Sequence, residues 1–195
     1  ICFGQATRLM EFMVDDTKLY RAEFTLGITT DTYDAYGTRV DEGDWSGISK
    51  ERVEEALLQF AGTTFQQPPM YSALKKDGRR LYELARAGVE VERPSREVVV
   101  TRIALLNWMP PRLILEVECG RGFYMRALAH DLGVFLGCGA HLSELIRLRT
   151  GPLTIEESIT PEQFEETVAH GDWENLIETP DFVLRGMPAM AVIPA

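Results

Sequence analysis

The sequence has few cysteines and histidines, and it has no long apolar run. It contains three residues of each of these two types in 195. Cys2, Cys119 and Cys138 form no C-x-x-C pair and do not suggest a disulfide framework, and the histidines show no metal-ligand spacing. No apolar run approaches the length of a membrane span, and no signal-peptide pattern opens the chain. We therefore expect a cytoplasmic, reduced protein that needs no metal or organic cofactor and has no membrane partner.

Net charge at first argues against a nucleic-acid partner, because the chain carries a formal charge of −10. The charge is unevenly distributed, however. Residues 1–64 and 154–195 carry net charges of −6 and −8, whereas residues 65–102 and 103–153 carry +3 and +1. Local potential, rather than total charge, governs contact with phosphates. The basic middle of the chain is therefore compatible with RNA binding.

Periodicity predicts one domain that mixes helices and strands. One face of the alternating run holds Leu113, Leu115, Val117 and Cys119, the other holds Ile114, Glu116 and Glu118, and the pattern indicates a strand with one buried face. The chain has N-cap patterns at Ser49 and, as a capping box, at Thr160. We expect helices over 5–14, 49–60, 79–87 and 123–136 and after 160, strands over 19–27, 95–106 and 113–119, and irregular structure over 31–44 and 66–78. This order predicts an α+β fold with a mixed, largely antiparallel sheet and flanking helices, and the acidic tail is expected to pack as scaffold.

The most informative stretch is residues 119–133. It follows the alternating strand, turns through two glycines and enters a helix that carries Tyr124 and Arg126 near its start. An aromatic ring beside a guanidinium suits recognition of a flat, polar ligand such as a nucleobase. Taken alone, the same pattern also fits an aromatic core residue next to a surface arginine.

This stretch resembles the glycine–aromatic–tyrosine–x–arginine motif of RNA pseudouridine synthases. Other segments resemble the TruB-type branch of that family, which acts on the T-loop of tRNA. These segments are Lys18-Leu19-Tyr20 followed by Leu26-Gly27 and Thr30-Asp31-Thr32, then Gln67-Pro68-Pro69-Met70-Tyr71-Ser72-Ala73-Leu74-Lys75, and Gly137-Cys138-Gly139-Ala140-His141-Leu142 closed by Leu145 and Arg147. Ordered matches over roughly the first 150 residues are more specific than any single short motif.

The resemblance implies a pseudouridine synthase-like catalytic domain that isomerises a T-loop uridine to pseudouridine. The base must leave the RNA stack, its glycosidic bond must break, and the C5 proton must be removed after reattachment. In the family, the nucleophilic aspartate lies in a glycine–x–leucine–aspartate–proline segment upstream of the residues that match Ile1–Thr7. We therefore expect residues 1–195 to form a single catalytic domain truncated at its N-terminus, without the small C-terminal RNA-binding domain. As it stands, this chain is expected to be inactive.

The resemblance also assigns roles to individual side chains. Tyr20 is expected to stack on the flipped uracil and to handle the C5 proton, and Tyr124 to line the same pocket. Arg126 matches the arginine that pairs with the catalytic aspartate, a role that suits its planar, two-pronged guanidinium. Leu145 is expected to be an apolar wall. For Tyr20 and Tyr124, the alternative interpretation is simple packing on the sheet.

A short acidic loop contains Asp31 and Asp34. The resemblance implies that this loop lies near the active site and that Asp31 supports substrate binding, whereas its turn-like setting suggests a side chain that caps backbone amides. We do not expect Asp31 to be the nucleophile. Arg126 is expected to lie beside Tyr20 and Tyr124 and either to pair with Asp31 or Asp34 or to face solvent.

Residues 65–96 match the segment that forms a mobile, RNA-clamping thumb in the family, and we call them the thumb. Its basic residues are expected to contact phosphates, and Tyr71 to offer a stacking surface. These basic residues are Lys75, Lys76, Arg79 and Arg80. The alternative is an ordinary solvated helix face.

Three functional hypotheses remain. The first is a tRNA pseudouridine synthase domain, acting as a monomer on the T-arm stem-loop. The second is an RNA-binding module of a ribonucleoprotein, like the dyskerin-type relatives, although the acidity of the chain disfavours it. The third is a catalytically inactive structural domain of the same fold.

Overall fold

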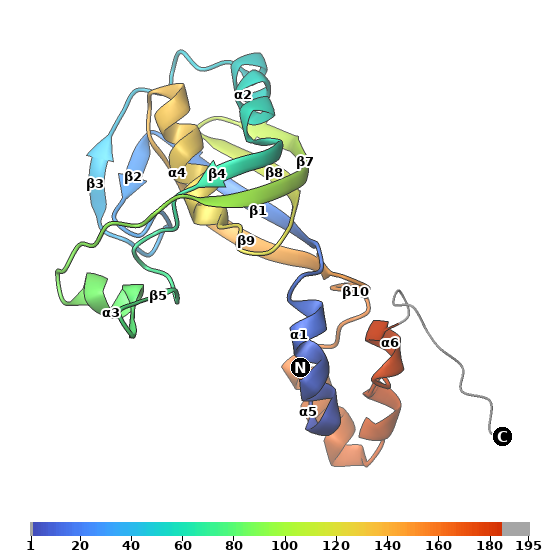
Figure 1. Cartoon of the computed structure of the whole chain (residues 1–195). Helices are drawn as coiled ribbons and strands as arrows, with labels where there is room; N and C mark the ends of the chain where they lie inside the picture. The colour runs from blue at the N-terminus through green and yellow to red at the C-terminus, as the bar shows by residue number, and fades with distance from the viewer. Residues whose placement is uncertain (1, 185–195) are drawn as a thin grey trace.

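The computed structural model describes residues 2–184, and a six-stranded antiparallel sheet is its central feature (Figure 1). The strand order is β10-β9-β1-β8-β7-β4. The strands are β1 (Lys18–Leu26), β4 (Gly62–Gln66), β7 (Arg96–Met109), β8 (Arg112–Cys119), β9 (Ala140–Thr150) and β10 (Leu153–Thr154). The sheet confirms the expected α+β class and its antiparallel character. A parallel bridge joins Asp34 to Leu142 at the rim of the sheet.

One face of this sheet is buried, and the other is open to solvent. In β1, Ala22, Phe24 and Leu26 are buried, whereas Arg21 on the opposite face is exposed. The predicted alternation in β8 has the same effect, because every second residue from Leu113 to Cys119 is buried. An antiparallel sheet with one solvated face commonly shows this pattern.

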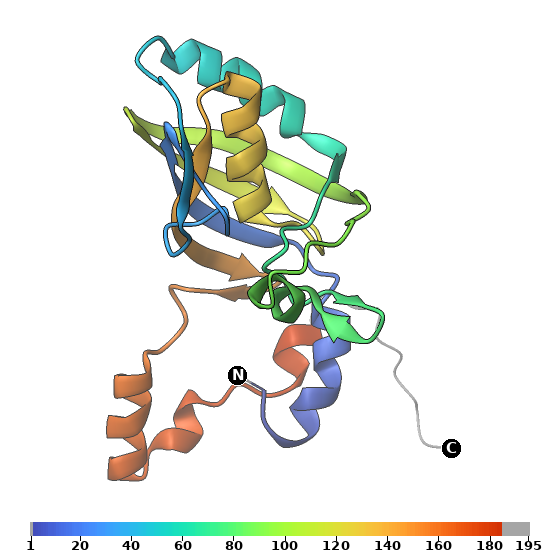
Figure 2. The same cartoon turned by 90° about the vertical axis from the view of Figure 1, so that its left-hand side faces the viewer.

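Helices α2 (Lys50–Leu57) and α4 (Met125–Leu136) cover the buried face (Figure 2). The side chain of Ser49 accepts a hydrogen bond from the amide of Arg52 and so caps α2, as predicted. Helix α4 packs closely on β9 at Gly133, where an added Cβ would lie 2.2 Å from the backbone nitrogen of Ala140. The glycine therefore allows α4 to approach the strand that completes the site described below.

Two small hairpins extend from this body. Strands β2 (Ile28–Thr30) and β3 (Arg39–Glu42) form one of them, with the acidic loop between them. Strands β5 (Lys75–Lys76) and β6 (Arg79–Arg80) form the other, and helix α3 (Leu81–Arg86) follows directly. The second hairpin and α3 make up the centre of the thumb.

Short helices at the two ends of the described chain form a separate lobe below the sheet (Figures 1 and 2). They are η1 (Gly4–Leu9), α1 (Met10–Met13), α5 (Pro161–His170), η3 (Trp173–Leu176) and α6 (Asp181–Leu184), whereas η2 (Leu58–Phe60) extends α2. Thr160 caps α5 through the predicted capping box. None of the residues of α5, η3 or α6 is buried, so these helices of the acidic tail do not contribute to the core. No helix within residues 2–184 is long and apolar enough to cross a membrane.

Some predicted element boundaries were wrong. The strands β4 and β9 were not predicted, and β3 and β5 lie in segments that were expected to be irregular. Arg79 and Arg80 belong to β6 rather than to a helix, because α3 begins only at Leu81. Strand β7 also continues to Met109, three residues beyond its expected end.

Candidate functional site

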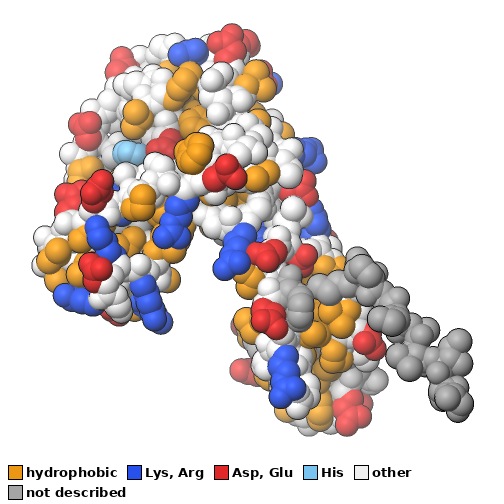
Figure 3. All heavy atoms as spheres, in the orientation of Figure 1, with side chains coloured by type: hydrophobic (Ala, Val, Ile, Leu, Met, Phe, Trp, Pro, Cys, Tyr) orange, Lys and Arg blue, Asp and Glu red, His pale blue; other side chains and the backbone are white. Residues whose placement is uncertain are grey.

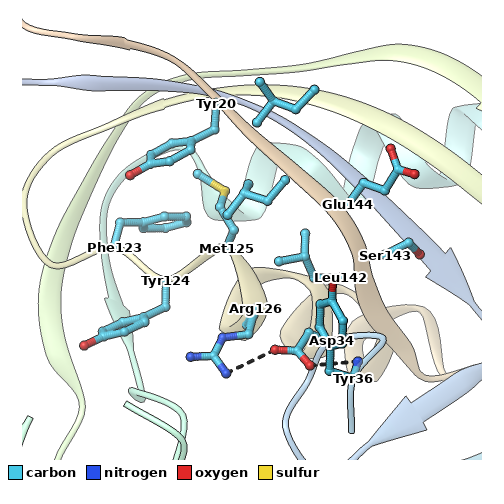
Figure 4. Close-up of a pocket in the computed structure, with 12 residues that line it drawn as sticks. Tyr20, Asp34, Tyr36, Phe123, Tyr124, Met125, Arg126, Leu142, Ser143 and Glu144 are labelled. Carbon is cyan, nitrogen blue, oxygen red and sulfur yellow. Dashed lines mark hydrogen bonds and ion pairs between the residues drawn. The ribbon is translucent and has the colours of Figure 1, made fainter. Parts of the chain in front are cut away.

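A cavity of about 580 Å³ opens where β1, β9, the N-terminal end of α4 and the acidic loop meet (Figure 4). Four of the residues assigned from the sequence line it: Tyr20, Tyr124, Arg126 and Leu145. They come from three segments that are far apart in the chain. The remaining lining residues are Asp34, Tyr36, Phe123, Met125, Leu142, Ser143, Glu144 and Ile146. The sequence therefore identified residues that the fold brings together.

Arg126 is held by acceptors from two other segments of the chain. Its Nη1 donates to Oδ2 of Asp34 at 3.2 Å and to the carbonyl of Thr32 at 3.3 Å. Its Nη2 donates to the carbonyl of Tyr71, in the thumb, at 2.5 Å. The side chains of Arg126 and Asp34 are only 25% and 20% exposed, so solvent screens this ion pair weakly. The expectation that Arg126 pairs with Asp31 or Asp34 is thus confirmed for Asp34.

The acidic loop is itself fixed in place. The Oδ1 atom of Asp34 accepts hydrogen bonds from the hydroxyl of Thr32 at 2.6 Å and from the amide of Tyr36 at 3.1 Å. The amide of Leu142 in β9 donates to the carbonyl of Tyr33, and the carbonyl of Leu142 accepts from the amide of Ala35. These bonds determine the direction in which the Asp34 carboxylate faces Arg126.

Asp31 takes a different position. It is exposed, it does not line the cavity, and its Oδ1 accepts a hydrogen bond from the amide of Thr38 at 2.8 Å. The side chain thus caps a backbone amide, as its turn-like setting suggested. Among residues 2–184, Asp34 is the carboxylate that pairs with Arg126.

Gln66 is a site residue that the sequence did not single out. Its buried amide accepts a hydrogen bond from the backbone amide of Tyr124 at 2.8 Å and donates to the carbonyl of Tyr124 at 3.0 Å. Tyr124 is the N-cap residue of α4, and its own side chain makes no capping hydrogen bond. Gln66 therefore holds the start of α4, next to Arg126. No local pattern could have revealed this pair, because the two residues are 58 positions apart.

Tyr20 lies on the buried face of β1, at the cavity wall. Burial raises the pKa of Tyr20, and the guanidinium of Arg147 opposes that rise. On the neighbouring strand, burial raises the pKa of the Cys119 thiol to about 12. Cys119 is therefore neutral at physiological pH.

The basic side chains of the thumb point into solvent around α3 (Figure 3). Lys75, Arg79 and Arg80 are exposed and Lys76 is half-buried, and none of them forms an ion pair with another described residue. The carbonyl of Tyr71 connects the base of the thumb to Arg126. In Figure 3 an open concavity separates the thumb from the helical lobe of α1 and α5.

The described residues contain no cluster of three or more His, Cys, Asp or Glu side chains that could hold a metal ion. Among the histidines, His130 stacks on the ring of Tyr33 with the centroids 4.0 Å apart, and burial lowers the pKa of His130. Nδ1 of His141 donates to the carbonyl oxygen of Ile28 at 2.9 Å, because a carbonyl can only accept.

Two family models match the chain. Residues 1–125 match the N-terminal domain of the TruB family pseudouridylate synthases, and residues 126–186 match the C-terminal domain of tRNA pseudouridylate synthase B. The boundary between the two matches lies within α4, inside one continuous fold, because β9 of the second part pairs with β1 of the first.

Curated proteins called tRNA pseudouridine synthase B are similar to this chain. The relative from Syntrophotalea carbinolica is 43% identical over 194 residues, which cover 100% of this chain and 63% of the relative. The one from Symbiobacterium thermophilum is 49% identical over 84% of this chain and 56% of its own length, and that from Pseudomonas aeruginosa is 46% identical over 90% and 58%. The chain thus spans about 56–63% of the length of these relatives.

Solved structures show the same fold. A Cbf5–Nop10–Gar1 complex contains a chain that matches 94% of this one, with a TM-score of 0.69 and 24% identity, over 47% of its own length. A chain in an H/ACA ribonucleoprotein bound to a substrate RNA with 2′-deoxyuridine matches 93%, with a TM-score of 0.62 and 22% identity, over 43% of its length.

Proposed function

Because the chain belongs to the TruB family of pseudouridylate synthases, we propose that it supplies the uridine pocket of an enzyme that converts a T-loop uridine of tRNA to pseudouridine. The observation that carries this proposal is the cavity in which Tyr20, Tyr124, Arg126 and Leu145 converge. Its volume and its mixed apolar and polar lining suit one flipped nucleobase.

Each pocket residue has a proposed role. The ring of Tyr20 stacks on the uracil, and its hydroxyl handles the C5 proton. Tyr124 and Leu145 form further walls. Arg126, already oriented by Asp34, holds the carboxylate of the nucleophile in its ionised, attacking form.

The thumb has a separate role in this proposal. Its exposed basic side chains attract the phosphates of the T-arm stem-loop, and Tyr71 places the base of the thumb against Arg126. RNA bound by the thumb would thus lie next to the pocket. We further propose that the enzyme acts as a monomer in the cytoplasm.

A chimera provides the test. In it, this chain replaces the matched part of the Syntrophotalea carbinolica relative, so that the segment carrying the family's aspartate precedes it. The readout is pseudouridine formed in a T-arm stem-loop RNA. We expect the chimera to convert the RNA, and we expect this chain alone not to convert it.

Two outcomes would contradict the proposal. A chimera that folds and binds the RNA without forming pseudouridine would favour an RNA-binding or inactive structural domain. Turnover by this chain alone that is lost in Asp31→Asn would make Asp31 the nucleophile instead.

A further inference from the structure

The strand β9 contains two irregularities that change which residues face β1. Along β1 the partner of Leu19 is Arg149, but the partner of Tyr20 is Arg147, so Leu148 is an extra residue in the ladder. A regular ladder would have placed Leu148 opposite Tyr20. A bulge that redirects a side chain is a common feature beside active sites. Here it places an arginine next to the proposed proton-handling tyrosine.

The two residues of this cross-strand pair share the face of the sheet that carries the cavity, but only Tyr20 lines the cavity, and Arg147 is exposed. Tyr20 shares its face of β1 with buried Ala22, whose partner on β9 is Leu145 of the cavity wall. Burial raises the pKa of Tyr20, and contact with the Arg147 guanidinium opposes that rise. Directly opposed side chains in an antiparallel pair are close enough for such a contact.

Few other charges act on the Tyr20 hydroxyl. On β8, Val117 lies opposite Tyr20, and Cys119, opposite Lys18, acts on Tyr20 from a diagonal position, but its pKa of about 12 keeps it a neutral thiol. Arg126 and Asp34 share the cavity but neutralise one another as an ion pair. Glu144, the remaining carboxylate of the lining, is exposed.

We propose that Arg147 is a positioning residue for Tyr20, which holds the phenol oxygen in place and stabilises its anionic form. This inference rests on the proposed function. After the uracil has reattached through C5, the C5–H bond breaks and its electron pair restores the C5–C6 double bond, while the electrons of the N1–C6 double bond move to N1, which takes up a proton from solvent. The proton passes to the phenolate oxygen of Tyr20 and forms its O–H bond, which later loses the proton to solvent. A neighbouring guanidinium favours the phenolate that this step requires.

The first experiment measures the ionisation of Tyr20 in this chain directly. Carbon NMR of protein labelled at the hydroxyl-bearing ring carbon of tyrosine follows each phenol through a pH titration, and Tyr20→Phe identifies the Tyr20 signal. In Arg147→Met we expect Tyr20 to titrate at higher pH than in the unaltered chain. Arg147→Lys, which keeps the charge, should restore part of the difference.

Arg21→Met is the matched control. It removes one positive charge at the residue next to Tyr20, but on the opposite, exposed face of β1. It should leave the Tyr20 titration unchanged. If Arg147→Met proves unstable, the Tyr20 titration is compared between Arg147→Lys, which keeps the positive charge, and Arg147→Gln, which removes it.

The second experiment measures the pH dependence of turnover in the chimera. Arg147→Met should move the ascending, acidic limb of the kcat profile to higher pH and lower kcat at neutral pH by roughly tenfold, with little change in KM for the RNA. A Tyr20 titration that does not shift, or that shifts equally in Arg21→Met, overturns the role of Arg147. If the Tyr20 titration shifts only in the Arg147 variant but the chimera forms no pseudouridine, the Arg147–Tyr20 pair is supported and the proposed function is contradicted.

Discussion

The pocket and the thumb both present arginines, but the structure holds them in opposite ways. In the pocket, Arg126 is mostly buried and donates to Asp34 and to two backbone carbonyls. In the thumb, Arg79 and Arg80 are exposed and form no ion pair with another described residue. The guanidinium of Arg80 donates to the hydroxyl of Tyr82 at 3.2 Å.

This difference separates two uses of the same side chain. A guanidinium fixed by several acceptors has already lost its rotamer freedom, so it can orient a reacting carboxylate without further ordering. Exposed cations are screened by salt but attract a polyanion over a distance and adjust to it on binding. We therefore expect changes in the pocket to affect the chemical step, and changes in the thumb to affect RNA affinity.

The largest effect is expected at Arg126. In the chimera, Arg126→Met removes the donor that orients the nucleophile and leaves the partly buried carboxylate of Asp34 unpaired. Turnover should fall by roughly 10³-fold, the order of loss seen when a positioned transition-state donor is removed. Single-turnover conversion of the stem-loop RNA measures this loss. Arg126→Lys should also be impaired, because an ammonium cannot reproduce the planar fork. Near-normal turnover in Arg126→Met would show that the pocket does not need its fixed charge.

A smaller loss is expected for Tyr20→Phe, which keeps the ring and removes the hydroxyl. In the chimera, RNA binding should remain nearly intact while turnover falls by roughly 10²-fold, because the hydroxyl transfers a proton. Parallel measurements of RNA affinity and kcat check this separation. Unchanged turnover would leave Tyr20 with a stacking role alone.

The thumb should respond in affinity rather than in chemistry. We expect RNA affinity to fall with salt, and each basic side chain removed from the thumb to flatten that dependence by about 0.7 in the log–log slope. The fourfold alanine variant of Lys75, Lys76, Arg79 and Arg80 tests this expectation by titration with a T-arm stem-loop at several salt concentrations.

Its control removes cations from the open face of the sheet. Arg21 and Arg102 lie there, away from the cavity, and Arg102 is already paired with Glu116. The double alanine variant should keep the original slope. If the fourfold thumb variant also keeps the original salt slope, the thumb does not contact phosphates and is an ordinary solvated surface.

The smallest effect concerns Asp131, a carboxylate on α4 that, unlike Asp34, gains no stabilising cation. Burial raises the pKa of Asp131 from 3.8 to about 6. The folded protein therefore disfavours the ionised form, and this destabilisation grows as pH rises from about 4 to 6 and is complete above that range. Asp131→Asn should increase the free energy of unfolding by about 1 kcal/mol at pH 8, allowing for partial exposure, and by nothing at pH 3.

Urea unfolding at the two pH values measures this difference. Asp34→Asn is the comparison, because it removes a carboxylate that does have a cationic partner, and it should lower stability at pH 8. If both variants are destabilised at pH 8, Asp131 is stabilised by a contact that its burial does not explain.

Local signals account for most of the elements that the sequence predicted. Ser49 and Thr160 cap their helices through residues three positions away, and the alternation in β8 needs only its own residues. Strand β9 was missed because its bulges at Ser143 and Leu148 interrupt the period of two. Strand β4, at the edge of the sheet, begins with Gly62 and two threonines and lacks a buried alternating pattern.

The candidate site also has a part that short motifs identified and a part that they left open. By resemblance, the sequence by itself identified Tyr20, Tyr124, Arg126 and Leu145, because their motifs are short and contiguous. It left open whether Asp31 or Asp34 pairs with Arg126, since both lie in one loop at similar distances along the chain.

Only the tertiary structure decided between them. The choice of Asp34 depends on how the acidic loop joins β9 at Leu142, and the clamp on Tyr124 depends on Gln66, 58 residues away. The pairing of Arg147 with Tyr20 depends on a bulge, which moves the register by one residue and reverses the face that each side chain occupies. Local sequence determines caps and alternation because those interactions span a few residues. Register and loop docking are set by the lowest free energy of the whole packed chain.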